Sequence, residues 1–213
     1  MTISPNSKTH CIILLLCIFA LVVLVSIGFC GFKKWMNKTK YEQSPETNEY
    51  FIVQNNKDEP DWVSKEVALR LSRLAIKADK VVMYMYENKL PNKAIAERLH
   101  ARWGNIRKNP KGFRETSFGE RSAAYTVNKG DELRICIRNP DSNEMFESEN
   151  TGFLVLLHEL AHLMSQSFGH NIEFKTNYAY ICKQAEELKL YRYVDYSKNP
   201  TSYCSTDITH SPF

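Results

Sequence analysis

Apolar residues recur at helical spacing in four segments of the chain. Two segments carry them at steps of three and four positions: Val67, Leu71, Leu74, Ala78, Val81 and Met85, then Ile95, Leu99, Trp103 and Ile106. Residues with this spacing share one face of an α-helix, so both segments are predicted to be amphipathic helices. Two further helices are predicted over residues 151–167, which include the run FLVLLHELAHLM, and over residues 171–189.

Alternating apolar and polar residues predict a small β-sheet. Residues 50–54 (YFIVQ) are β-branched and aromatic, as is typical of a strand. Residues 125–127 and 133–138 alternate in polarity on either side of the turn sequence NKGD, which predicts a hairpin. This mixture of elements predicts an α+β fold. Because about 170 residues bury one core rather than two, residues 50–213 are expected to form a single domain.

A continuous apolar run lies near the N-terminus. Residues 11–32 contain no charged side chain, and 22 residues at helical rise span about 33 Å, enough for a hydrocarbon core of about 30 Å. We therefore expect a transmembrane helix over residues 11–32, after an N-terminal tail (1–10) and before a basic, polar juxtamembrane stalk (33–49). A cleaved signal peptide is the alternative, although its apolar core is usually about 7–15 residues long.

Lysines beside the apolar run predict its orientation. One lysine precedes the run and four follow it: Lys8, then Lys33, Lys34, Lys38 and Lys40. Positive residues near a span stay on the cytoplasmic side, so we expect a single-pass membrane protein whose domain faces the cytoplasm or a virion interior. The first 40 residues contain no acidic residue, and the rest of the chain is nearly neutral, so the net charge of +4 predicts no partner.

The cysteines do not suggest a disulfide framework. Three of the six lie in the apolar run, and the others, Cys136, Cys182 and Cys204, are irregularly spaced. An odd number at irregular spacing in the domain is not the pattern of a disulfide-stabilised protein.

The helix predicted over residues 151–167 contains the sequence HELAH at 158–162. His158 and His162 lie four residues apart, so both imidazoles project from one helix face and can share one metal ion. Glu159 lies about 100° from His158, where a carboxylate can take a proton from a water molecule that zinc activates. Chance produces HExxH about 0.01 times in a chain of this composition, so a metal site is the preferred interpretation.

A zinc hydrolase needs a third protein ligand and an open position for water. Gly169 can adopt the left-handed conformation that ends a helix, and the chain then folds back so that His170 faces the first two histidines. His170 is therefore the expected third ligand. Three carboxylates are alternatives: Glu173, Glu186 and Glu187.

HELAH followed by GHNIEF at 169–174 resembles the HExxH…GHxxxF signature of the SprT-like and WLM zinc metallopeptidases. The match is specific over residues 154–174, and the order of predicted elements agrees with WLM-type domains, including single-pass versions in large DNA viruses. The resemblance implies a zincin-like domain in which a small antiparallel or mixed sheet packs on the HExxH helix.

The resemblance also implies a site and a reaction. His158, His162 and His170 would bind one Zn²⁺ ion, and Glu159 would be the general base and acid of peptide-bond hydrolysis. The strand over residues 133–138 would be the sheet edge to which an extended protein or peptide substrate adds.

A basic segment offers a second chemistry. Six cations lie within 17 residues, with two aromatic residues between them: Arg98, Arg102, Arg107, Lys108, Lys111 and Arg114. The segment is either a nucleic-acid or anionic-lipid surface or a solvated helix face.

Taken together, these patterns predict a membrane-anchored zinc metallopeptidase. The alternative is a noncatalytic, zinc-stabilised, membrane-tethered adaptor that binds nucleic acid or a protein partner.

Overall fold

The computed structural model describes residues 17–19, 21–23, 38–117, 119–120, 122–139 and 145–212. The chain divides into two compact units, residues 1–39 and 40–213. The second unit is an α+β domain with three small sheets, and it contains the site discussed below.

The structure does not support the predicted transmembrane helix over residues 11–32. Among the described residues, no helix is long and apolar enough to span a bilayer, so this prediction is wrong. Residues 17–19 and 21–23 are helical, and the rest of the run lies outside the described residues. The predicted single-pass membrane localisation, with its cytoplasmic or virion-interior orientation, depended on that helix and is therefore also wrong.

The four helices of the domain lie where the apolar stripes predicted them. They are α2 (Asp61–Glu87), α3 (Lys93–Lys108), α4 (Glu149–Met164) and α5 (Ile172–Glu187). Three of them begin at a polar N-cap whose side chain accepts a backbone N–H: Asn92 for α3, Ser148 for α4 and Asn171 for α5. All six residues of the first stripe are buried on α2, which confirms that helix.

The strands form one mixed sheet and two hairpins. The sheet has the order β3-β5-β4, in which β3 (Phe113–Glu115) is parallel and β4 (Ala124–Val127) antiparallel to the central β5 (Glu132–Ile135). One hairpin pairs β1 (Thr39–Gln43) with β2 (Tyr50–Gln54), and the other pairs β6 (Thr201–Tyr203) with β7 (Thr206–Ile208). The predicted hairpin with the NKGD turn is therefore confirmed as β4–β5.

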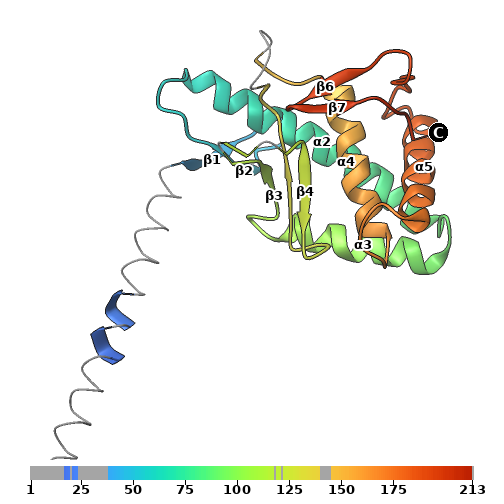
Figure 1. Ribbon diagram of the computed structural model, residues 1–213, viewed down its shortest axis with the longest axis horizontal. Helices are drawn as coiled ribbons and strands as arrows, with labels where there is room; N and C mark the ends of the chain where they lie inside the picture. Colours follow the sequence, from blue (N-terminus) through green and yellow to red (C-terminus); the bar gives the residue numbers. More distant parts are fainter. Residues whose placement is uncertain are drawn as a thin grey trace, which may run out of the picture. The chain divides into compact units, whose positions relative to one another are not determined.

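The helix α4 is the centre of the core. It contacts α2, α3 and α5 as well as β4 and β5, so almost every side of it is covered (Figure 1). Its residues Phe153, Leu156, Leu157 and Leu160 are fully buried. A helix that is covered all round needs apolar residues all round, which explains the run FLVLLHELAHLM and makes α4 a rigid support for the two histidines it carries.

Four features of the domain differ from the sequence predictions. Strand β1 lies in the segment expected to be a stalk, and β3 and the β6–β7 hairpin were not predicted. The helix α4 ends at Met164 rather than Ser167. The sheet edge beside α4 is β4, because β5 is paired on both sides, so the strand over residues 133–138 is not the edge that the family resemblance implied.

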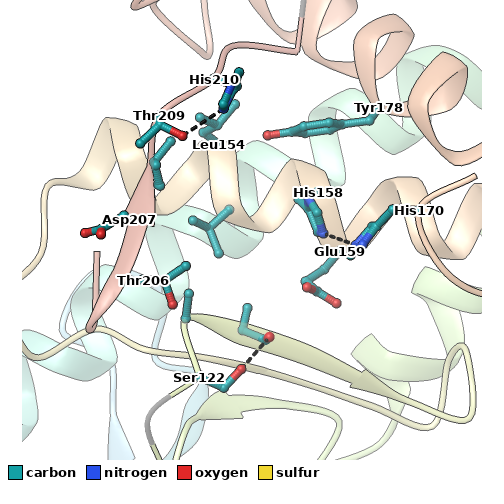
Figure 2. A pocket seen from close by; sticks show the side chains of 14 residues that line it. Ser122, Leu154, His158, Glu159, His170, Tyr178, Thr206, Asp207, Thr209 and His210 are labelled. Atoms are coloured by element: carbon teal, nitrogen blue, oxygen red, sulfur yellow. Dashed lines mark hydrogen bonds between the residues drawn. The ribbon is translucent and has the colours of Figure 1, made fainter. Parts of the chain in front are cut away.

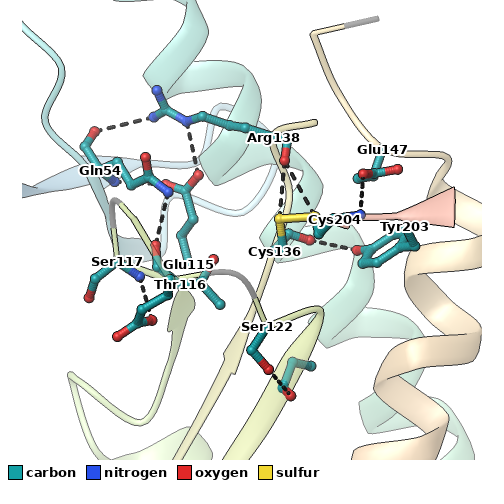
Figure 3. The surroundings of a disulfide bond; sticks show 12 residues. Gln54, Glu115, Thr116, Ser117, Ser122, Cys136, Arg138, Glu147, Tyr203 and Cys204 are labelled. Atoms are coloured by element: carbon teal, nitrogen blue, oxygen red, sulfur yellow. Dashed lines mark hydrogen bonds and ion pairs between the residues drawn. A yellow bond between two sulfur atoms is a disulfide. The ribbon is translucent and has the colours of Figure 1, made fainter. Parts of the chain in front are cut away.

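A disulfide bond that the cysteine spacing did not predict joins Cys136 to Cys204, with their Cα atoms 6.4 Å apart (Figure 3). Cys136 directly follows β5, and Cys204 lies in the turn between β6 and β7. Beside it, the Tyr203 hydroxyl donates to the Cys136 carbonyl at 2.5 Å, and the Cys204 N–H donates to Glu147 Oε1 at 2.7 Å. These contacts attach the C-terminal hairpin to the end of the sheet.

Candidate metal centre

Three histidine side chains converge in a cleft beside α4. The Nε2 atom of His170 lies 3.0 Å from Nε2 of His158 and 3.2 Å from Nε2 of His162. One ring nitrogen from each residue lies within 4.8 Å of the other two. Figure 2 shows His158 and His170 directed toward one another from α4 and from the loop that follows it. The structure thus brings together the three histidines that the sequence singled out.

The spacing of these nitrogens fits a small divalent cation. Zinc in tetrahedral geometry, with Zn–N bonds of about 2.0–2.1 Å, holds its nitrogen ligands about 3.3 Å apart. A single Nε2 proton on His170 can be donated to only one of its two neighbours, so hydrogen bonding cannot satisfy all three nitrogens. Within the described residues, no other group of His, Cys, Asp or Glu side chains is close enough to hold one ion.

The protonation of the histidines suits metal binding. Burial, followed by the charges of His162 and His170, lowers the pKa of His158 to about 3. Burial, followed by the charges of His170 and Lys129, lowers the pKa of His162 to about 4. Both imidazoles are therefore neutral near pH 7, the form in which histidine binds metals.

The loop between α4 and α5 carries the third histidine. Gly169 has φ = +79°, the left-handed conformation expected there, and a Cβ atom at that position would meet no neighbour. Its requirement for glycine is therefore conformational rather than steric. His170 follows it and is exposed, whereas His158 and His162 are half-buried on α4.

None of the three alternative carboxylates belongs to this cluster. Glu173 accepts hydrogen bonds from the backbone N–H groups of Gln166 and Ser167 at 2.8 and 3.0 Å. Glu187 accepts from the Gln184 side chain at 3.1 Å, and Glu186 is its neighbour at the end of α5. The geometry therefore favours His170 as the third donor.

Glu159 lies between the histidines and strand β4. Its side chain is almost fully buried, and its Oε2 atom accepts a hydrogen bond from the Thr126 hydroxyl at 2.8 Å. Burial raises the pKa of Glu159 to about 7, although the hydrogen bonds from Thr126 oppose that shift. One carboxylate oxygen is thus held by β4. Figure 2 shows the carboxylate below His158 and His170, on the side of the cleft formed by the sheet.

Two hollows flank the histidines and share the residues Ala124, His158, Glu159 and His170. We name them the β7 hollow, of about 420 Å³, and the Phe168 hollow, of about 350 Å³. Both hollows have mixed linings. Apolar and aromatic side chains (Ala123, Leu154, Val155, Tyr178 and Ile208) and polar ones (Ser122, Thr206, Asp207, Thr209 and His210) line the β7 hollow. The Phe168 hollow is lined by Tyr125, Thr126, Asn128, Lys129 and Phe168. The hollows form one cleft along β4.

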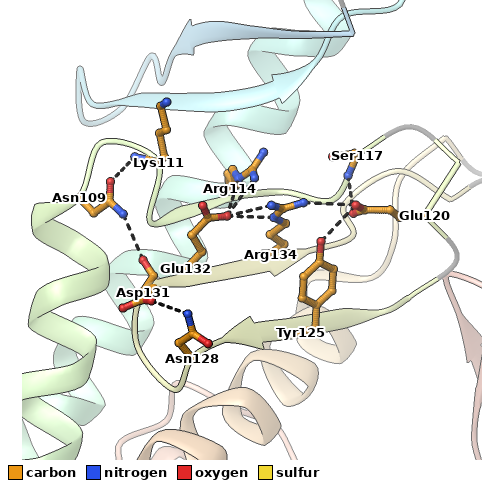
Figure 4. A network of polar contacts seen from close by, with 10 residues as sticks. All are labelled: Asn109, Lys111, Arg114, Ser117, Glu120, Tyr125, Asn128, Asp131, Glu132 and Arg134. Carbon is orange, nitrogen blue, oxygen red and sulfur yellow. Dashed lines mark hydrogen bonds and ion pairs between the residues drawn. The ribbon is translucent and has the colours of Figure 1, made fainter. Parts of the chain in front are cut away.

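The basic segment is largely engaged in contacts within the domain. Arg107 pairs with Glu49 at 2.8 Å, and Arg114 pairs with Glu132 at 2.9 Å, as part of the polar network in Figure 4. Arg98 and Arg102 donate to backbone carbonyls at the end of α4. These contacts favour a structural role over nucleic-acid binding for four of its six cations.

The sequence analysis missed Thr126, Lys129, Phe168 and strand β7, all of which line the cleft. Thr126 and Lys129 belong to the predicted hairpin. The alternation of apolar and polar residues in that hairpin does not indicate that Thr126 faces α4. Phe168 could have been noticed, because it lies between HELAH and His170 in a segment with no apolar stripe.

Comparison with known proteins gives one relative without a described activity. A protein of Acanthamoeba polyphaga mimivirus, described as uncharacterized protein R325, is 29% identical over 186 residues, which cover 86% of this chain and 89% of that protein. No family model matches the chain, and no solved structure matches it. The function is therefore argued from the site.

Proposed function

We propose that this chain is a zinc metallopeptidase of the SprT-like or WLM kind that hydrolyses peptide bonds. The observation that carries the proposal is the convergence of three histidine nitrogens next to a buried glutamate, in a cleft that follows the edge of a sheet. A structural zinc site is closed by four protein ligands, so it requires neither a glutamate between two of its ligands nor an open cleft on both sides.

Each residue of the site has a separate task. His158, His162 and His170 would hold the ion, which supplies Lewis acidity for a carbonyl group and for a water molecule. Glu159 accepts the proton of the attacking water on one carboxylate oxygen and delivers it to the leaving amine nitrogen. Thr126 holds the other oxygen, so the carboxylate keeps one orientation through both proton transfers.

Strand β4 provides the binding surface for an extended peptide. It is the edge of the three-stranded sheet, so a peptide can add to it by main-chain hydrogen bonds. β4 runs from Ala124, which lines both hollows, toward Thr126, which lines only the Phe168 hollow. A peptide that adds in the antiparallel direction therefore lies with its N-terminal part at the Phe168 hollow and its C-terminal part at the β7 hollow.

The test combines metal analysis with a cleavage assay on the full chain and an unfolded protein such as casein. Glu159→Gln should keep the zinc content of the wild type and lower the cleavage rate about 10²–10⁴-fold, because it removes the general base. His170→Ala should lower the zinc content. Glu186→Gln is the matched control for both measurements, because Glu186 is a carboxylate at the far end of α5.

Two results would refute the peptidase proposal. Cleavage by Glu159→Gln at the wild-type rate would remove Glu159 from the chemistry. Full zinc occupancy without cleavage of any unfolded substrate would favour the noncatalytic, zinc-stabilised adaptor instead.

A further inference from the structure

The loop that carries His170 has little apolar burial to hold it in place. Phe168 is 82% exposed and Ile172, at the start of α5, is 83% exposed. His170 itself is exposed, and a Cβ atom added to Gly169 would contact no neighbouring atom. A loop of this kind needs polar contacts to keep one conformation, because fixing each backbone residue costs roughly 1–2 kcal/mol of conformational entropy.

Three cations supply these contacts on the carbonyl side of the loop. Five successive carbonyl oxygens, from Leu163 to Ser167, each accept a hydrogen bond from Arg98, Arg102 or Lys129. Arg102 Nη1 donates to Leu163 at 2.8 Å and to Ser165 at 2.9 Å, and Arg98 Nη1 donates to Met164 at 2.6 Å. We name Arg98, Arg102 and Lys129 the cationic clamp.

Lys129 makes the contacts nearest to the third histidine. Its Nζ atom donates to the carbonyls of Ser165, Gln166 and Ser167 at 3.2, 2.7 and 2.6 Å. The same ammonium lies 4.2 Å from the centre of the Phe168 ring. One side chain therefore fixes four successive residues of the loop, and the chain reaches His170 two residues after the last of them.

The backbone conformation of the turn between β4 and β5 places Lys129 next to the loop that carries His170. Asn128 and Lys129 both have left-handed φ values, of 46° and 53°. Gly130 follows with φ = +141°, and a Cβ atom there would lie 3.2 Å from Cβ of Arg102. The glycine thus lets the turn approach α3 closely enough for Lys129 and Arg102 to reach carbonyls of the same loop.

The N–H side of the loop is held by a single carboxylate. Glu173 accepts from the backbone N–H groups of Gln166 and Ser167 and from the Ser167 hydroxyl. Cations on the carbonyls and an anion on the N–H groups together leave this short segment few alternative conformations.

We propose that the cationic clamp positions His170 for metal binding and that Lys129 is its decisive positioning residue. The inference rests on the proposed zinc site and adds residues that touch no ligand nitrogen. Outer-shell partners that orient metal ligands change metal affinity by about 10–100-fold when they are removed. The clamp also explains why a cluster of arginines on α3 faces the end of the metal-binding helix, where cations complement the helix dipole.

The test measures zinc affinity in the full chain by competition with a chromophoric chelator. Lys129→Met keeps the unbranched stem but loses the donors, and it should weaken zinc binding about 10–100-fold. Lys129→Arg should restore most of the affinity, because a guanidinium can also donate to several carbonyls. Lys108→Met, on the exposed last turn of α3, is the matched control and should bind zinc as the wild type does.

A purely structural role for Lys129 would give a different pattern. Lys129→Met would then lower the melting temperature of the metal-free chain but leave zinc affinity unchanged, and that result would overturn the proposal. Arg98→Met provides a second variant, with weaker zinc binding expected for the same reason. Absence of zinc binding by the wild type would overturn the zinc site itself, which is distinguishable from failure of the clamp alone.

Discussion

Reduction of the Cys136–Cys204 disulfide should destabilise the domain strongly. The bond joins residues that are 68 positions apart, so it removes about 15 cal/mol/K of chain entropy from the unfolded state, or about 4.4 kcal/mol at 25 °C. Domains of this size are stable by about 5–15 kcal/mol, so the loss is a large fraction of the whole. The same change corresponds to a fall in melting temperature of about 9–18 °C.

The loss should be concentrated at the β7 hollow. The Cys136 N–H donates to the carbonyl of Ala123, which lines one side of that hollow, and Cys204 begins the turn into β7, which lines the other. Reduction therefore removes the covalent link between the two sides. Peptides that extend into the β7 hollow should bind more weakly after reduction. Zinc affinity should be unchanged, because the loop that carries His170 is held by hydrogen bonds from α3, from the β4–β5 turn and from Glu173.

Urea denaturation of the oxidised and reduced chain measures this effect directly. Cys182 is a buried free cysteine in both forms, so it cancels from the comparison. A Cys136→Ala/Cys204→Ala variant should unfold at a urea concentration close to that of the reduced wild type. A difference below about 1 kcal/mol between the oxidised and reduced chains would refute the chain-entropy reasoning.

Two further substitutions test the surroundings of the site. Thr126→Val should destabilise the domain by about 1–3 kcal/mol in urea denaturation, because it removes the hydroxyl that donates to the buried Glu159 oxygen. It should also lower kcat without loss of zinc, and an unchanged kcat would show that the Thr126 hydroxyl does not orient the base. Glu173→Gln should lower stability by at most about 1 kcal/mol at pH 7, because solvent screens this exposed carboxylate, and by less at pH 3. Hydrogen bonds from Ser167 and Gln166 lower the pKa of Glu173 to about 2, so the carboxylate stabilises the fold above its unfolded pKa of about 4.5 and loses that effect as the pH falls toward 2. A difference that grows on acidification would contradict this assignment.

The helices could be predicted from the sequence because each contains its own signal. The apolar stripes on α2, α3 and α5 and the HELAH run on α4 are all local patterns. The convergence of His170 on α4 could also be anticipated, because Gly169 lies directly before it. These predictions needed only the periodicity of one segment and the conformational freedom of one residue.

The remaining features depend on contacts between distant segments. Strands β3 and β7 are three residues long, too short for a pattern of alternation, and each is fixed by its pairing partner. The disulfide joins two cysteines whose spacing matches no known framework. Arg102 reaches a carbonyl 61 residues away in the chain, so its role could not be inferred from the local cluster of charges.

The division of the histidines between a rigid helix and a surface loop separates two properties of the centre. His158 and His162 are fixed by the packed core around α4, whereas His170 stands on the solvent side. We expect ion capture to begin at the helical pair and to be completed when the exposed His170 side chain turns toward the ion, with release in the reverse order. The residence time of the ion would then depend on how firmly the clamped loop orients His170.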